Sequence, residues 1–195
     1  MSRNTYVKID AHKYDQKNQF RENSTGDYSK IEPYDMWLGD AQTAIDVDFL
    51  ESKNIGVIID VGSKNIYDFK NDSHPYESIY NSKLTELTPK LRKSKFVYKR
   101  IDIADDPTES LDCHFVDVIE TIETAFSEGR SVLIHCQAGV SRSATLVVAY
   151  VMYKRDMDYL EALSYVRRFR RSIRPNVGFV KQLKQFNPPQ PPKIK

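Results

Sequence analysis

Residues 132–151 read VLIHCQAGVSRSATLVVAYV, and this stretch decides the fold of the chain. The short apolar run 132–134 has the length and composition of a strand that is buried on both faces. A polar segment with one glycine follows, and residues 146–151 are then apolar on nearly every side, which predicts a central buried helix. A strand that leads through a short loop into a helix is the repeating unit of α/β folds.

The rest of the chain continues this alternation. Compact apolar runs predict further strands over 36–38, 55–61 and 96–101. Apolar residues at helical spacing predict helices from 47 to an exit near 55, over 115–126 before Gly129, from the capping pair Asp158 and Glu161 through 169, and over 180–186. We therefore predict a single α/β domain with a mostly parallel central β-sheet flanked by α-helices.

The length of 195 residues supports one buried core and is short for two. Residues 1–28 are polar without a steady period, which predicts a loosely ordered extension. Residues 188–195 are rich in proline and predict a stiff tail, so the folded domain is expected over 29–187. Residues 63–95 are polar and long for a connection, which is typical of a functional or disordered loop.

Composition excludes several classes of protein. With 40% hydrophobic and 29% charged residues the chain has the balance of an ordinary globular protein, and a net charge of +2 gives no reason to expect nucleic acid as a partner. Two cysteines make neither a disulfide framework nor a zinc site, so we expect no metal and no cofactor. We find no secretory signal, lipidation motif or long apolar run, and expect a cytoplasmic or nuclear protein without a membrane anchor.

Basic residues gather at 90–100 and at 167–174. Each cluster is either a solvated face or a surface that attracts acidic or phosphorylated partners. Cys113 is expected to be a packing residue on a helix, and the alternative is a redox partner of Cys136.

The loop between the strand and the central helix, residues 135–143 (HCQAGVSRS), has the composition of an anion-binding site. A loop that enters a helix N-terminus directs several backbone N–H groups to one place, where the helix dipole adds positive potential. Gly139 lets the backbone turn inward without a side chain. We predict a nest for phosphate, call residues 135–143 the phosphate loop, and expect the following residues to line it: Gln137, Ala138, Gly139, Val140, Ser141 and Arg142.

Cys136 is expected at the bottom of this nest. The N–H groups and Arg142 would favour its thiolate form, which is the nucleophile. Arg142 carries a planar fork of donors that can hold two phosphate oxygens. Ser143 can donate a hydrogen bond to the sulfur when the sulfur is the leaving group. The alternative is an inert buried cysteine beside a helix-capping serine.

The segment HCQAGVSRS resembles the HCxxGxxRS signature of the protein tyrosine phosphatase superfamily, and its AGxSRSA form is most similar to dual-specificity phosphatases. Residues 149–152 (AYVM), 174–179 (RPNVGF) and 37–39 (WLG) also resemble family motifs, so that the likeness covers about residues 30–187. The resemblance implies a protein tyrosine phosphatase-like fold and a cysteinyl-phosphate intermediate. It also implies supporting roles for His135 and Asn176.

Such an enzyme needs a general acid, because the leaving oxygen must take up a proton. Three carboxylates, Asp102, Asp105 and Asp106, precede the predicted helix at 115. The family places its acid a fixed short step before the leucine that opens this helix, and Asp105, six residues before Leu111, occupies that place. Asp106 is the next candidate, and the alternative for all three is helix capping.

The interior of the phosphate loop carries no lysine, which favours phosphoproteins over multiply charged phosphoinositides as substrates. We therefore predict a dual-specificity protein phosphatase that acts on phosphotyrosine and on phosphoserine or phosphothreonine. Related scaffolds also act on phosphoinositides, glucans or RNA 5′ ends, and these remain alternatives. A catalytically silent pseudophosphatase that only binds phosphoproteins is a further alternative. The physiological substrate, the oligomeric state and the completeness of the chain stay open.

Overall fold

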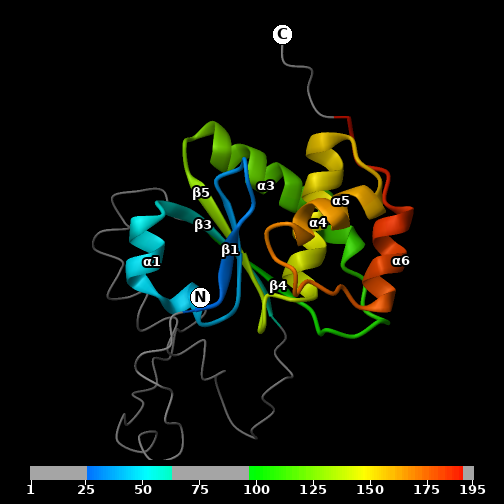
Figure 1. Cartoon of the computed structure of the whole chain (residues 1–195), viewed down its shortest axis with the longest axis horizontal. Coiled ribbons are helices and arrows are strands. Elements are labelled where there is room, and N and C mark those ends of the chain that lie inside the picture. The colour runs from blue at the N-terminus through cyan, green and yellow to red at the C-terminus, as the bar shows by residue number, and fades with distance from the viewer. Residues whose placement is uncertain (1–25, 63–96, 191–195) are drawn as a thin grey trace, which may run out of the picture.

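The computed structural model describes residues 26–62 and 97–190, which form a five-stranded sheet covered by helices (Figure 1). The strands lie in the order β1-β2-β5-β3-β4. β1 is antiparallel to β2, and the other three pairings are parallel. The bounds are β1 Tyr28–Lys30, β2 Met36–Gly39, β3 Ile55–Gly62, β4 Val97–Asp102 and β5 Ser131–His135. The predicted single α/β domain with a mostly parallel sheet is confirmed.

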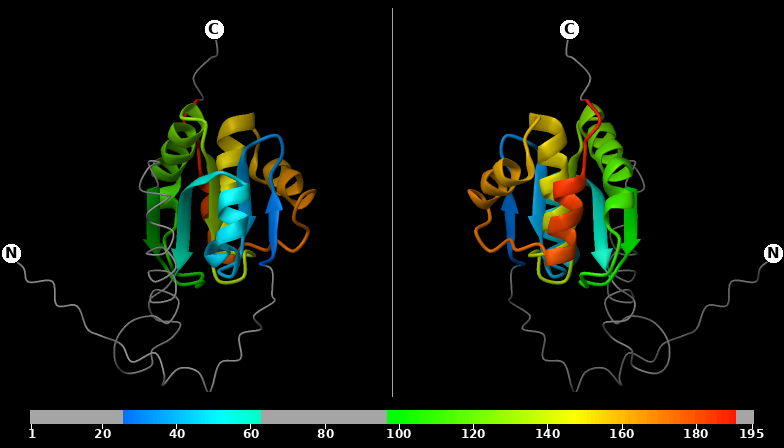
Figure 2. Two further views of the ribbon diagram at one scale, coloured as in Figure 1. Left: turned by 90° about the vertical axis from the view of Figure 1, so that its left-hand side faces the viewer. Right: turned by 90° about the vertical axis from the view of Figure 1, so that its right-hand side faces the viewer.

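Helices cover both faces of this sheet. Figures 1 and 2 show α1 on one side and the larger group α3 to α6 on the other. The α-helices are α1 Val47–Ser52, α3 Phe115–Ser127, α4 Arg142–Arg155, α5 Tyr159–Arg167 and α6 Val177–Gln185. Two 3₁₀ turns, η2 Thr43–Ile45 and η4 Asp112–His114, precede α1 and α3.

The β5–α4 unit lies at the centre of the fold. All five residues of β5 are buried between its neighbours β2 and β3. Twelve residues of α4, from Arg142 to Tyr153, are buried as well, because α3, α5 and α6 pack around it. This explains why α4 is apolar on nearly every side, and it fixes the loop between β5 and α4 in the middle of the molecule.

The sequence analysis did not predict β1, because its three residues at the sheet edge, YSK, carry no apolar pattern. Expectations about α5 were wrong in part. α5 ends at Arg167 and not at 169, and Leu160, expected on its apolar side, is 64% exposed. Residues 1–25, 63–96 and 191–195 lie outside the described part of the chain, so the loosely ordered extension, the long loop and the end of the stiff tail stay predictions. The domain boundaries 29 and 187 stay predictions as well.

Over residues 26–62 and 97–190, no helix combines the length and the hydropathy that crossing a membrane requires.

Candidate active site

The phosphate loop turns its carbonyl oxygens outward. Every carbonyl from Gln137 to Ser141 accepts a hydrogen bond; the donors, in order, are Ala41 N, Arg170 Nη2, Arg170 Nε, Arg174 N and Thr145 N. In a trans peptide the C=O and the following N–H point in opposite directions. The N–H groups of residues 138–142 are therefore directed to the inside of the loop. This is the arrangement that an anion-binding nest requires.

Gly139 allows the backbone of the phosphate loop to adopt this conformation. Its φ of +64° lies in the left-handed region, which residues with a side chain rarely adopt. A Cβ atom at this position would lie 2.6 Å from the carbonyl oxygen of Gly39 at the end of β2, and 3.0 Å from Nη2 of Arg170. The first distance is shorter than real Cβ contacts and involves a backbone atom, and the second is tight, so a side chain here would displace the loop from its support.

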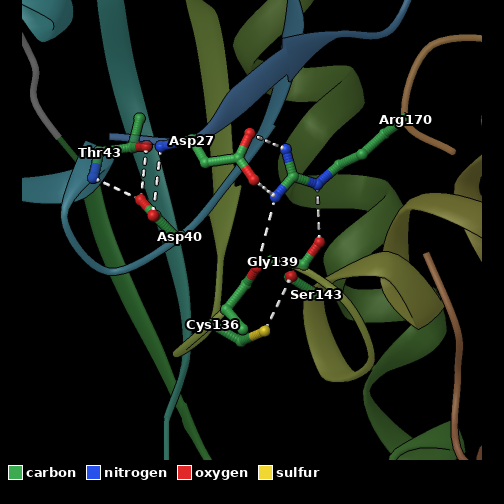
Figure 3. Close-up of polar contacts among 8 residues, drawn as sticks. Asp27, Asp40, Thr43, Cys136, Gly139, Ser143 and Arg170 are labelled. Carbon is green, nitrogen blue, oxygen red and sulfur yellow. Dashed lines mark hydrogen bonds and ion pairs between the residues drawn. The ribbon is translucent and has the colours of Figure 1, made fainter. Parts of the chain in front are cut away.

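Arg170 supports the loop from behind (Figure 3). Its Nε and Nη2 donate to the carbonyls of Gly139 and Ala138 at 2.9 and 3.3 Å. Its two terminal nitrogens also bind the two carboxylate oxygens of Asp27, both at 2.9 Å. Arg170 is only 4% exposed, and a buried guanidinium is tolerated when a carboxylate and further acceptors satisfy it.

Asp27 is placed by the turn that follows β2. The N–H of Asp27 donates to Oδ2 of Asp40, and the N–H of Asp40 donates to the carbonyl of Asp27, each at 3.2 Å. Oδ1 of Asp40 accepts from the N–H and the hydroxyl of the buried Thr43 at 2.8 and 2.7 Å. The chain before β1 is thereby connected to the phosphate loop through Asp27 and Arg170.

The sequence did not reveal this contact. Arg170 belongs to the basic cluster 167–174, for which we expected a solvated face or a partner surface, and for Arg170 that expectation was wrong. Asp27 lies 143 residues earlier, in the predicted extension. A local pattern carries no signal for such a pair.

Cys136 lies beneath the loop, where it is only 3% exposed. The hydroxyl of the fully buried Ser143 donates to its Sγ at 3.1 Å. Arg142 is also 3% exposed, and its Nη1 donates to the carbonyl of Ile103 at 3.2 Å. Its buried Nε has no hydrogen-bond partner among the described residues. A buried, positively charged N–H without a partner beside an anion nest is a donor that an anion would satisfy.

Asp105 is held against the phosphate loop although its side chain is exposed. Its Oδ1 accepts from the hydroxyl of Ser141 at 2.6 Å and from Nδ2 of Asn176 at 2.8 Å. The Ser141 hydroxyl in turn accepts from the N–H of Asn176 at 3.1 Å. The other oxygen of Asp105, Oδ2, has no partner among the described residues and remains available for a proton.

The two neighbouring carboxylates are placed differently. Oδ1 of Asp106 accepts from the N–H and the hydroxyl of Thr108 at 2.8 and 2.6 Å. These hydrogen bonds lower the pKa of Asp106 and favour its charged form. Asp102 is the last residue of β4 and is exposed. Asp105 contacts the phosphate loop through Ser141, and its role as the acid stays a prediction.

His135 is buried directly before the cysteine. Burial lowers its pKa, and this effect is partly offset by Asp60, whose Oδ1 lies 3.8 Å from Nε2 of His135. The two residues face each other in the parallel register of β3 and β5. The hydroxyl of Tyr98 donates to the other oxygen of Asp60 at 2.6 Å. His135 is therefore a neutral imidazole beneath the loop at neutral pH.

Cys113 lies in η4 with its side chain exposed, so the expectation of a packing residue was wrong. In the described ranges, no three residues among His, Cys, Asp and Glu gather as a metal-binding group would.

The burial of His135 predicts a pH dependence of stability. In the unfolded chain histidine takes up a proton near pH 6.5, whereas the folded state resists it, so stability is lost as pH falls through that value. Between pH 7.5 and 5.5 the free energy of unfolding falls, and we expect His135→Gln to make this decrease smaller by up to about 1.4 kcal/mol. Denaturant unfolding at both pH values measures this. An unchanged difference would show that the imidazole becomes protonated within the fold.

The contacts of Arg170 predict a role in anion binding. Charge-assisted hydrogen bonds are worth about 1.5–3 kcal/mol, so Arg170→Gln should weaken the binding of inorganic phosphate by about tenfold. Arg171→Gln removes the same charge from the exposed neighbouring residue and should change the affinity by less than about twofold. Calorimetric titration with phosphate compares the two variants. Equal losses in both would mean that only the total charge matters.

Comparison with known proteins agrees with this geometry. The sequence profile of the dual specificity phosphatase catalytic domain matches residues 36–188. Dual specificity protein phosphatase 22 of Xenopus tropicalis is 40% identical over 122 residues, which cover 59% of this chain and 57% of that protein. Dual specificity protein phosphatase 1B of Arabidopsis thaliana is 32% identical over 151 residues, which cover 77% of each chain.

Among solved structures, the human tyrosine phosphatase-like serine/threonine/tyrosine-interacting protein superposes with a TM-score of 0.65. It is 31% identical, and the match covers 81% of this chain and 93% of that one. The chain thus spans little more than half the length of the Xenopus relative and nearly all of the human structure. Since the family profile covers residues 36–188, from the start of β2 to beyond the end of α6, the chain belongs to the dual specificity phosphatase family.

Proposed function

We propose that the chain is a protein phosphatase that hydrolyses phosphotyrosine and phosphoserine or phosphothreonine through a cysteinyl-phosphate intermediate. The observation that carries the proposal is the orientation of the phosphate loop around Cys136. Its carbonyls face outward to donors, and Nε of Arg142 has no partner among the described residues. Donors fixed before the substrate arrives need no rearrangement during the reaction, which is the most effective form of electrostatic catalysis.

In the first step the phosphate group of the substrate enters the nest. The thiolate of Cys136 attacks phosphorus and forms the S–P bond while the ester P–O bond breaks. Asp105, in its protonated form, gives its proton from Oδ2 to the leaving oxygen. Its Oδ1 stays bound to Ser141 and Asn176, which keeps the acid beside the loop.

In the second step a water molecule attacks the phosphorus of the cysteinyl phosphate. Asp105, now a carboxylate, takes the proton from this water, and the S–P bond breaks to release inorganic phosphate. The sulfur leaves as a thiolate, and the Ser143 hydroxyl at 3.1 Å stabilises the charge that develops on it.

The charges around the loop support a phosphoprotein substrate. Residues 137–141 bring no cationic side chain into the nest. The guanidinium behind the loop, Arg170, is paired with the carboxylate of Asp27. Arg142 is then the cation that the loop itself offers to a substrate, which suits a single phosphate group better than the multiply charged head group of a phosphoinositide.

Phosphate release from a peptide that carries both phosphothreonine and phosphotyrosine tests the proposal. We expect the wild type to release phosphate from both sites and Cys136→Ser to release none. Asp105→Asn should be slower by at least about a hundredfold, because it cannot protonate the leaving oxygen. Asp106→Asn is the matched control, and it should stay within about threefold of the wild type because Thr108 engages this carboxylate away from the loop.

Other outcomes would point elsewhere. A wild type that cleaves a phosphoinositide, a glucan phosphate or an RNA 5′ end, but not the peptide, would overturn the substrate class and retain the chemistry. A wild type that binds the phosphopeptide without cleaving it would identify a pseudophosphatase. If Asp105→Asn and Asp106→Asn slow phosphate release equally, Asp105 is not identified as the general acid.

A further inference from the structure

The segment that carries Asp105, residues 103–112, is fastened to helix α6, and we call this segment the acid loop. One side chain makes three of the contacts. Oε1 of Gln182 accepts from the N–H groups of Leu111 and Asp112 at 2.8 and 3.0 Å. Its Nε2 donates to the carbonyl of Glu109 at 2.7 Å. A single amide thus satisfies three backbone groups of the acid loop from about 70 residues further along the chain.

The first turn of α6 touches the acid loop at two further points. Asn176 caps the helix by accepting the N–H of Phe179 at Oδ1, and its Nδ2 donates to Asp105. A Cβ atom at Gly178 would lie 2.0 Å from the carbonyl oxygen of Pro107, so the backbones of helix and loop are in direct contact there. α6 therefore holds the acid loop at its acid, in its middle and at its end.

The acid loop has little regular structure of its own to hold this shape. Between the end of β4 and the start of η4 it forms neither a strand nor a helix. Its internal hydrogen bonds are short-range: Thr108 and Glu109 donate to Asp106, and the Ser110 hydroxyl donates to Asp112. Such a segment takes its position from its contacts with the rest of the fold.

We propose that Gln182 is a positioning residue, which holds the acid loop where Asp105 can protonate the leaving oxygen. This inference rests on the proposed function. A general acid acts only within hydrogen-bond reach of the leaving oxygen, and a misplacement of about 1 Å can cost about a hundredfold in rate. Gln182 lies on α6, and the nearby residues Phe179 and Leu183 of this helix are buried. The packing of α6 on the core therefore fixes the position of the Gln182 side chain.

A series of aryl phosphates with phenols of decreasing acidity separates this role from a merely structural one. An acidic phenol leaves without a proton, whereas a weakly acidic one depends on the acid. We expect Gln182→Met to lower kcat/KM by about tenfold for phenyl phosphate and by less than about twofold for the most acidic phenol. Asp105→Asn shows how kcat/KM depends on the acidity of the phenol when no general acid is present. The dependence for Gln182→Met should lie between that of Asp105→Asn and that of the wild type.

Gln185→Met is the matched control, since it makes the same substitution at an exposed position of the same helix. It should reproduce the wild-type dependence on the phenol. Gly178→Ala is a second variant, in which α6 gains helix propensity of about 1 kcal/mol while the new Cβ displaces Pro107. Gly178→Ala should also make kcat/KM depend more steeply on the acidity of the phenol. It tests the proposal independently if Gln182→Met folds poorly.

Hydrogen exchange of the amides of Leu111 and Asp112 gives a readout that needs no turnover. Gln182→Met should speed their exchange by about tenfold or more, and Gln185→Met should leave it unchanged. Unchanged exchange in Gln182→Met, or an equal loss of kcat/KM for all phenols, would overturn the positioning role. Absence of turnover in the wild type would instead overturn the proposed function, and exchange would still decide whether Gln182 holds the loop.

Discussion

The fold depends on one constraint, which is that the peptide groups of the phosphate loop must all face the same way. Each N–H that points into the nest forces a carbonyl to point out, and a buried carbonyl needs a donor. The donors come from three separate parts of the chain: the turn after β2, the segment between α5 and α6, and α4 itself. β2, β5 and α5 must therefore pack in one arrangement for the loop to keep its shape.

A second polar connection joins the phosphate loop to the acid. The hydroxyl of Ser141 donates to Asp105 and accepts from the backbone of Asn176, so one side chain links the loop, the acid loop and the start of α6. Arg142 adds a parallel link through the carbonyl of Ile103. Two hydrogen-bonded links thus join the phosphate loop to the acid loop, and Asn176 at the start of α6 contacts both.

The sequence predicted those parts of this arrangement that depend on local pattern. The buried strand Val132–Ile134, the all-round apolar helix after it and the capping pair Asp158 and Glu161 each have a signal within a few residues, and the structure contains all three. The contacts of Gln182 and Arg170 have no such signal. Glutamine on a helix and arginine in a basic cluster are typical of exposed surface, and only the folded chain brings their partners within reach.

The two buried arginines support the proposal that the site takes a single phosphate group. Arg170 and Arg142 are both nearly inaccessible, yet the charge of Arg170 is balanced by Asp27, whereas Arg142 donates to a neutral carbonyl and keeps an unsatisfied Nε. Burying an uncompensated guanidinium is costly, and an anion that binds next to Arg142 removes this cost. Arg170 instead contributes through the orientation of the peptides it binds. In the proposed phosphatase, Arg170 shapes the loop and Arg142 binds the substrate phosphate, because Asp27 already balances the charge of Arg170.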